Sequence, residues 1–433
     1  MLLSLFSGVV LGVFILSDFS FFASVKTLFS LFTSLLTTAW ILKTLGFAIL
    51  VGSIMALIER SGGINGFIDF MQHRAKLVSS SRSSLVLSYV VGVIIFIESS
   101  ITSLIAGAVG KPFCHKYRIP QAKLAFVCDS TSAPISSLIV LNGWGALLLG
   151  LISTQITQGV IEADAITLLI DSVIYNFYAM SALAVTFVAI WFNIDIGPMK
   201  NTKYIPITTE TILPNPQSMY YMLLPIILMI FLVFLFLYLT GDGNILKGSG
   251  SSSIFYTVLT TLLFTLFYYV PKKNMTLNTW TASTLSGAKK LFPIAMILLF
   301  AFAIGDVTSE LKTGQYLASL AQKSLSIYLL ASVIFLLSSL ISFSTGTSWG
   351  TFSIMIPIAM PMAVAMDADV ALCIGAVISG GIFGDHCSPI SDTTIISSMA
   401  SDCDVVEHVR TQLPYALISG FIALISFFIF SLT

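Results

Sequence analysis

The segment GDHCSPISDTT, residues 384–394, places two aspartates, a histidine and several hydroxyl-bearing residues directly after the apolar run at 371–383. Pro389 predicts that a helix ends near 385–389, because proline has no N–H to donate and its ring clashes with the preceding turn. Backbone carbonyls freed by such a break are costly in hydrocarbon unless they face protein, water or a ligand. Carbonyl, carboxylate and hydroxyl oxygens are the ligands that small hard cations prefer, so the segment predicts a site for a cation such as Na⁺.

A second segment, DSTSAPISS at 129–137, has the same kind of composition. Pro134 predicts a similar helix break there. The short sequence SAPIS (132–136) also resembles CSPIS (387–391). Each of the two follows an apolar stretch that is interrupted at its centre, which indicates a related position in two halves of the chain.

Several carboxylates lie at predicted membrane depth. The four that we expect to serve an ion are Glu98, Asp129, Asp385 and Asp392. A carboxylate there costs about 2.5–3.5 kcal/mol on insertion scales, so it usually marks an ion or proton pathway. The alternative is that each is neutral and only joins helices by hydrogen bonds. That structural role is favoured for Asp171 and Asp306, while Asp402, Asp404 and Glu407 read as a solvated loop.

Hydroxyl side chains gather at the same predicted breaks. They are Ser99, Thr102 and Ser103; Ser130–Ser132; Thr345–Ser348; and Ser388–Thr394. One serine in a membrane helix commonly bonds its own backbone, but clusters at four breaks favour a ligand-lining role for some members. His386 is equally consistent with a group that titrates near neutral pH and with a structural donor to a carbonyl.

The elements that position these residues are membrane helices. Of 433 residues, 56% are hydrophobic and 9% charged, and the mean hydropathy is +0.97. A soluble protein carries roughly 25% charged residues. The net charge is zero, so no nucleic-acid surface is indicated. The sequence has no P-loop, GxSxG or HExxH motif and no CxxC pair, so we expect neither an enzyme nor a cofactor or zinc site.

Apolar windows of helical length recur along the chain. The predicted crossings are 2–18, 29–58, 120–157, 166–192, 219–240, 252–270, 291–310, 370–400 and 412–432. Two further stretches, 84–110 and 327–365, are interrupted by FIESSITS (96–103) and FSTGTSWG (343–350). We interpret each as a re-entrant hairpin.

Charge supports that interpretation. Eight of the twenty lysines and arginines fall between residues 60 and 123, in groups on both sides of 84–110. Basic loops favour the cytoplasm, and a re-entrant hairpin keeps both groups there. The prediction is an all-α polytopic membrane protein with two inverted-topology repeats, 1–192 and 252–433, joined by a linker and connector helix at 193–251.

Three segments resemble the NhaC-type Na⁺/H⁺ antiporter family of the ion transporter superfamily. They are YRIPQAKLAFVCDSTSAPISSLIVLNGWGA (117–146), GTSWGTFSIMIPIAMPMA (346–363) and GDHCSPISDTTIISS (384–398). The resemblance implies two inverted repeats with re-entrant hairpins and broken helices, in a protein that is often a homodimer. Many relatives carry paired aspartates in the first hairpin, where this chain has Glu98 followed by Ser99.

Matched position by position, the resemblance implies roles for Asp129, Ser132, Asp385, Ser388, Asp392 and the Gly346–Gly350 loop. The expected ion- and substrate-binding set is Glu98, Asp129, Ser132, Thr345, Gly346, Thr347, Ser348, Asp385, Ser388, Asp392 and Thr393. Asp129, Asp385 and Asp392 are the expected Na⁺ ligands.

Two functions remain open from the sequence. The first is a Na⁺/H⁺ antiporter of a bacterial inner membrane, whose carboxylates bind Na⁺ or H⁺ competitively. The second is a Na⁺- or H⁺-coupled carrier of a small organic solute, such as an amino acid or a malate- or lactate-like carboxylate. A channel is disfavoured because paired acids at broken helices would bind ions too well for fast conduction. The expected partners are the lipid bilayer, Na⁺, H⁺, a small solute in the second case, and a second copy of the chain.

Overall fold

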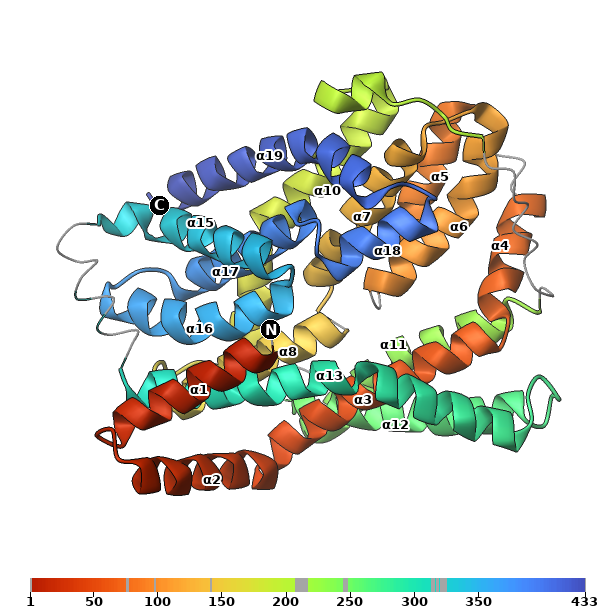
Figure 1. The fold of residues 1–433 in the computed structure, drawn as a ribbon. Helices are drawn as coiled ribbons and strands as arrows, with labels where there is room; N and C mark the ends of the chain where they lie inside the picture. Colours follow the sequence, from red (N-terminus) through yellow and green to blue (C-terminus); the bar gives the residue numbers. More distant parts are fainter. Residues whose placement is uncertain are drawn as a thin grey trace.

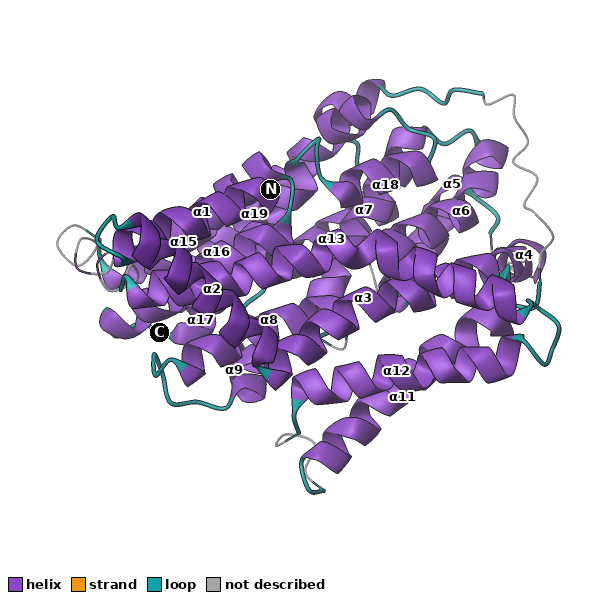
Figure 2. Ribbon diagram, turned by 60° about the horizontal axis from the view of Figure 1, so that its bottom comes forward, coloured by secondary structure: helices purple, strands orange, loops and turns teal. Residues whose placement is uncertain are grey.

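The computed structural model describes most of the chain, and helices form the regular structure of that described part (Figures 1 and 2). The described residues are 2–74, 78–96, 99–140, 142–206, 217–243, 248–312, 316, 319 and 325–432. The first helices are α1 Leu2–Leu16, α2 Phe21–Thr37, α3 Ala39–Arg60, α4 Gly63–Arg74, α5 Ser81–Ile94, α6 Ser99–Tyr117, α7 Gln121–Leu138, α8 Gly143–Thr157, α9 Ala165–Ile174 and α10 Phe177–Phe192. The others are η1 Gly197–Asn201, α11 Tyr220–Thr240, α12 Gly250–Tyr269, α13 Leu277–Glu310, α15 Ile327–Thr345, α16 Ser348–Ala365, α17 Val370–Cys387, α18 Asp392–Ala400 and α19 Val405–Phe430.

The helices have the length and composition of membrane spans. Eight helical segments of the described residues qualify as crossings, and α7 with α8, bent by 49° at their break, adds a further candidate. The polytopic helical membrane class predicted from composition is confirmed.

The helices form two layers, which Figure 1 shows one above the other. In the α3–α13 layer, α3 packs on α12 and α13, α11 packs on α12, and α1 and α2 cover α13. In the α7–α17 layer, α15 packs on α17, α10 on α19, and α5 and α6 on α7. The layers meet where α8 and α16 pack against α13. Of the four acids expected to serve an ion, the structure describes Asp129, Asp385 and Asp392, and all three lie in the α7–α17 layer.

Close backbone contact holds the second predicted hairpin to the helix that follows it. A Cβ atom on Gly380 would lie 2.4 Å from the Phe335 carbonyl oxygen, and one on Gly384 would lie 2.3 Å from that of Ser339. Glycine therefore lets α17 approach α15 more closely than any other residue would allow. Small residues at an interface stabilise membrane helix pairs by this kind of packing, because lipid provides no hydrophobic driving force between helices.

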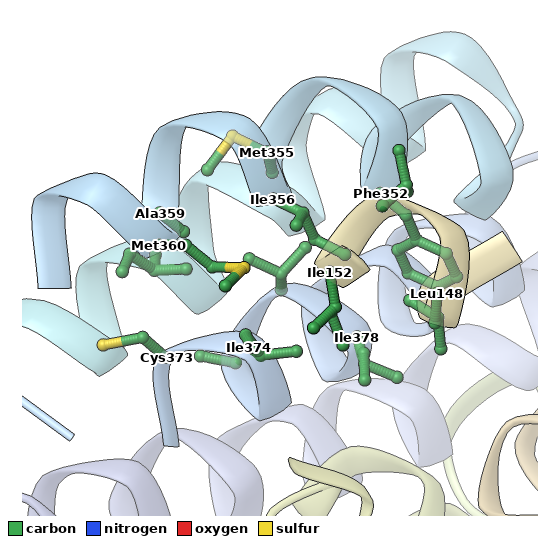
Figure 3. Close-up of a cluster of buried hydrophobic side chains, with 14 of the residues drawn as sticks. Leu148, Ile152, Phe352, Met355, Ile356, Ala359, Met360, Cys373, Ile374 and Ile378 are labelled. Atoms are coloured by element: carbon green, nitrogen blue, oxygen red, sulfur yellow. The ribbon is translucent and has the colours of Figure 1, made fainter. Parts of the chain in front are cut away.

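A buried apolar cluster joins α8, α16 and α17 (Figure 3). Leu148 and Ile152 of α8 lie against Ile356 of α16 and Ile374 and Ile378 of α17, and all five are almost fully buried. Each buried side chain makes many individually weak dispersion contacts. The cluster therefore fixes α8, which follows the first break, against α17, which precedes the second break.

Both predicted hairpins are pairs of packed helices, α5 with α6 and α15 with α16. The 14 residues of α5 extend about 21 Å, less than the roughly 30 Å of a hydrocarbon core. This length supports a re-entrant first hairpin. With 19 and 18 residues, α15 and α16 extend about 27–29 Å, so length alone does not separate a hairpin from two crossings there. Re-entry remains a prediction for both.

Three local expectations differ from the structure. Pro134 lies inside α7, which continues to Leu138, and α8 begins at Gly143. The last carbonyls of α7 are instead taken up by side chains, because the Ser137 hydroxyl donates to the Pro134 carbonyl (2.7 Å) and the Asn142 amide to that of Ser136 (2.6 Å). The window 29–58 is divided into α2 and α3 at Thr38, and 166–192 into α9 and α10 at Tyr175–Asn176.

Candidate functional site: carboxylates at a broken helix

The break between α17 and α18 lies where the sequence predicts it. α17 ends at Cys387, the non-helical residues 388–391 contain Pro389, and α18 begins at Asp392. The break interrupts helical geometry next to Asp385, whose carbonyl accepts the Ser388 N–H at 3.1 Å. Asp385 and Asp392 therefore lie on opposite sides of a short non-helical segment.

Both carboxylates interact with the N-terminal end of α18. Asp385 is 1% exposed; its Oδ1 accepts the Ser391 hydroxyl at 2.7 Å and its Oδ2 the Thr393 hydroxyl at 3.4 Å. Asp392 is the first residue of α18, is exposed, and accepts the Thr393 N–H at 2.9 Å. The unsatisfied N–H groups and the dipole at a helix N-terminus favour negative charge. This end of α18 therefore stabilises two adjacent carboxylates.

Asp129 lies fully buried in α7 and accepts hydrogen bonds from two other helices. Its Oδ2 accepts the side-chain amide of Gln412 on α19 at 2.8 Å and the hydroxyl of Thr394 on α18 at 3.3 Å, and its Oδ1 accepts the hydroxyl of Ser397 on α18 at 3.4 Å. Helices α7, α17 and α18 lie together in Figure 1. These hydrogen bonds therefore join Asp129 to α18, the short helix that begins with Asp392 and whose N-terminal hydroxyls bond Asp385.

Two buried histidines flank Asp129. The Nε2 atoms of His386 and His408 lie 3.9 and 3.7 Å from its Oδ2. His386 Nδ1 lies 2.6 Å from the Tyr178 hydroxyl, and His408 Nδ1 lies 2.8 Å from that of Ser398. Within the described residues, lysine forms ion pairs elsewhere, with Asp402 and Asp195, and no lysine or arginine pairs with Asp129, Asp385 or Asp392.

Each hairpin ends against a helix break. The Ser388 hydroxyl donates to the Phe343 carbonyl at 2.9 Å, next to the tip of the second hairpin. At that tip, Gly346 has a φ of 66° and lies directly against Ile390. In the first hairpin, the Phe96 carbonyl accepts the side-chain amide of Asn142 at 3.0 Å, beside the α7–α8 break.

The fold of this chain is similar to that of a solved transporter. The YdaH transporter of Alcanivorax borkumensis matches with a TM-score of 0.62 over 94% of this chain and 88% of that one, at 14% sequence identity. The sequence model of the Na⁺/H⁺ antiporter family matches residues 142–432, more than half of the chain. The chain belongs to the Na⁺/H⁺ antiporter family. The family expected from the three sequence segments is confirmed.

Two relatives bear on this antiporter-family protein. An uncharacterized protein of Haemophilus influenzae is 30% identical over 439 residues, which cover 96% of this chain and 84% of the relative. The malate-2H⁺/Na⁺-lactate antiporter of Bacillus subtilis is 41% identical over 88 residues, 20% of this chain and 18% of the relative. The family consists of antiporters, so the protein is a multi-pass secondary transporter.

Several predicted site residues of this antiporter-family protein make only local bonds. The Ser132 hydroxyl donates to the backbone carbonyl of Asp129 at 2.9 Å, and that of Thr345 to Ile341 at 2.8 Å. Thr347 caps α16, and Ser348 is 2% exposed. Among the hydrogen bonds of the described residues, none joins these four side chains to the carboxylate of Asp129, Asp385 or Asp392, and their part in the site stays a prediction. Glu98 lies outside the described residues.

Sequence reasoning missed four residues of the cluster. They are Tyr178, Ser397, His408 and Gln412. A signal existed for two of them, because His408 and Gln412 are four residues apart and so share one face of α19, where its apolar window begins. Within the described part of the chain, no three His, Cys, Asp or Glu side chains converge in a way that could hold a metal ion.

Proposed function

We propose that the protein exchanges Na⁺ for H⁺ across a bacterial inner membrane, with Asp385, Asp392 and Asp129 as the groups that bind the two ions in turn. The observation that carries this proposal is the environment of Asp385. Its carboxylate is almost fully buried at a helix break, and within the described residues no lysine or arginine neutralises it. A buried charge without a partner is costly, so such a site favours a bound cation or a proton.

Oxygen atoms suited to Na⁺ surround the break. The carboxylates of Asp385 and Asp392, the hydroxyls of Ser391 and Thr393, and the carbonyls freed between the two helices are hard ligands. Protonation of a carboxylate removes the charge that attracts the cation. Na⁺ and H⁺ would therefore compete for the same oxygens, and this competition is what couples the two opposite movements.

A second candidate is a Na⁺- or H⁺-coupled carrier of a small organic solute. It is favoured by the Bacillus relative, which is a malate-2H⁺/Na⁺-lactate antiporter. Against it, the two lysines that form ion pairs in the described part of the chain pair with Asp402 and Asp195, away from Asp129 and Asp385. Neither lysine is placed to bind the carboxylate of a solute at these aspartates. The single-cation function is therefore the first choice.

We also propose that the two units 1–192 and 252–433 are inverted repeats that form a homodimeric transporter with a second copy of the chain. Support comes from the order of elements. In each half a helical hairpin precedes a broken helix, as α5–α6 precede α7–α8 and α15–α16 precede α17–α18. Each hairpin also bonds to the break that follows it, through Asn142 in one half and Ser388 in the other.

One assay separates the two functions. In everted vesicles that hold an acid-inside pH gradient, Na⁺ alone should dissipate the gradient if the protein is a Na⁺/H⁺ antiporter. If it is a solute carrier, dissipation should require malate, lactate or an amino acid as well. No response to Na⁺ or Li⁺ from neutral to alkaline pH, with purified protein shown to be folded, would overturn the first function.

A further inference from the structure

Gln412 has an amide orientation that its neighbours fix. Its side-chain nitrogen lies 2.8 Å from Asp129 Oδ2 and 2.6 Å from the backbone carbonyl oxygen of His386. The backbone carbonyl can only accept, and the ionised Asp129 carboxylate accepts as well, so the donating NH₂ group must face them. The amide oxygen therefore faces His408 Nε2 at 2.8 Å, and that nitrogen must carry a hydrogen.

This one amide connects three helices. Gln412 is fully buried on α19, Asp129 lies on α7, and the His386 carbonyl belongs to the last turn of α17. The last carbonyls of a helix have no hydrogen-bond donor within the helix. The Gln412 N–H therefore supplies the donor that the His386 carbonyl lacks because the helix breaks there. Asp385 immediately precedes His386 in the chain. By bonding both the Asp129 carboxylate and the His386 carbonyl, the Gln412 NH₂ group therefore fixes the distance between Asp129 and Asp385.

Within the described residues, no other hydrogen bond to the Asp129 carboxylate is as short. The remaining donors, Thr394 and Ser397, lie at 3.3 and 3.4 Å and both belong to α18. Hydrogen bonds to a charged group are stronger than those between neutral groups, and the shortest contributes most. Without Gln412, the hydrogen bonds that the described residues make to the Asp129 carboxylate all come from α18, the helix beyond the break.

We propose that Gln412 is a positioning residue for cation binding, which holds the Asp129 carboxylate in register with Asp385 across the α17–α18 break. This inference rests on the proposed function, because its role is to keep the site in the form that binds Na⁺. Apparent affinity falls in proportion to the fraction of molecules in the competent form, so loss of Gln412 weakens Na⁺ binding without removing a ligand of the ion.

The test replaces Gln412 with methionine, which keeps most of the side-chain volume and removes both hydrogen-bonding atoms. Gln121→Met is the matched control, because Gln121 is also buried, at 7% exposure, and bonds through both amide atoms, to the backbone of Ile205. In proteoliposomes, Q412M should raise the KM for Na⁺ roughly ten-fold or more, with a maximal rate close to wild type. Q121M should leave KM unchanged. Should Q412M not fold, Q412N shortens the same amide by one methylene and is expected to raise KM in the same direction.

Equal KM values in Q412M and Q121M overturn the inference. So does a Q412M variant whose maximal rate falls only as far as its amount of folded protein falls, with KM unchanged. A wild type that shows no Na⁺ exchange contradicts the proposed function instead. In that case a thermal-unfolding cycle of Q412M, D129N and the double variant, without Na⁺, decides the inference. Non-additive effects support coupling between the two side chains, and additive effects overturn it.

Discussion

The hydroxyl of Ser388 donates to the backbone carbonyl of Phe343 at 2.9 Å and so joins the tip of the second hairpin to the α17–α18 break. Asn142 bonds the Phe96 carbonyl at 3.0 Å in the first half of the chain. Each contact links a hairpin to the very segment whose backbone leaves the helical path. The hairpins therefore help to keep the backbone non-helical at the two breaks. Substitutions at these contacts should affect the carboxylate site.

Replacing Ser388 with alanine should destabilise the protein. Ser388 is fully buried, so the variant leaves the Phe343 carbonyl without its donor, at a cost on the order of 1–3 kcal/mol. Ser344→Ala is the control, since the exposed Ser344 hydroxyl donates only to Leu340 of its own helix. Thermal unfolding of both variants in detergent checks this. Equal melting temperatures for the two would contradict the assigned role of Ser388.

Replacing Asp385 or Asp392 with asparagine should abolish Na⁺-dependent transport while the protein still folds. Asparagine keeps the volume and much of the hydrogen bonding but removes the charge that attracts the cation. Stability should change little, because an uncompensated acid is no longer held at membrane depth. Thermal stabilisation by Na⁺ should vanish in the same variants, since a ligand stabilises only the state that binds it.

The control for these variants is Asp402→Asn. Asp402 pairs with Lys111 at 2.7 Å near the protein surface and has a φ of 54°, which asparagine tolerates well. It should keep both transport and Na⁺ stabilisation. If D385N and D392N instead lose stability and retain transport in whatever folds, the two aspartates join helices rather than bind ions.

The sequence was sufficient for the second break and for the family. Proline, glycine and paired acids in an apolar run are local signals, and α17 ends within two residues of Pro389 as expected. The same reasoning was wrong at Pro134, where α7 continues to Leu138. A proline removes one hydrogen bond of a helix, and tertiary side chains such as Asn142 decide whether the helix ends there or further along.

The partners of Asp129 could not be predicted from local patterns. Thr394 lies 265 positions away in sequence and Gln412 lies 283 away, and no short sequence motif joins either residue to Asp129. Their meeting depends on how α18 and α19 pack on α7, which no periodicity in a single segment encodes. Sequence reasoning therefore found the acids and missed the groups that orient them.

Cysteine labelling should decide the topology of the hairpins. Ser79→Cys, before α5, and Lys116→Cys, in the last turn of α6, are at exposed positions and should label only from the cytoplasm if that hairpin is re-entrant. Ser326→Cys and Asp367→Cys, flanking α15–α16, should label only from outside. Background from the native thiols should be low, because burial raises the pKa of the Cys403 thiol to about 12 and the other four cysteines are buried. Labelling of Ser79→Cys and Lys116→Cys from opposite faces would contradict the inverted repeat.

Replacing Gly346 with alanine should impair both folding and transport, because the tip of the second hairpin has no room for a side chain. A Cβ atom there would lie 2.7 Å from Ile390 Cγ1 and 2.9 Å from the Ile390 carbonyl oxygen, well inside the roughly 3.5–4.0 Å of a favourable contact. The left-handed φ of 66° adds strain of about 1–3 kcal/mol for a residue other than glycine.

Gly159→Ala separates the two effects, since Gly159 has a similar φ of 73° and nothing within 4 Å of the added atom. Thermal unfolding and Na⁺-driven proton transport of the two variants should show a modest loss of stability with normal transport for G159A, and a larger loss with impaired transport for G346A. The difference between them measures how closely the hairpin tip must approach the break, and matching results for both variants would mean that this approach does not matter to the site.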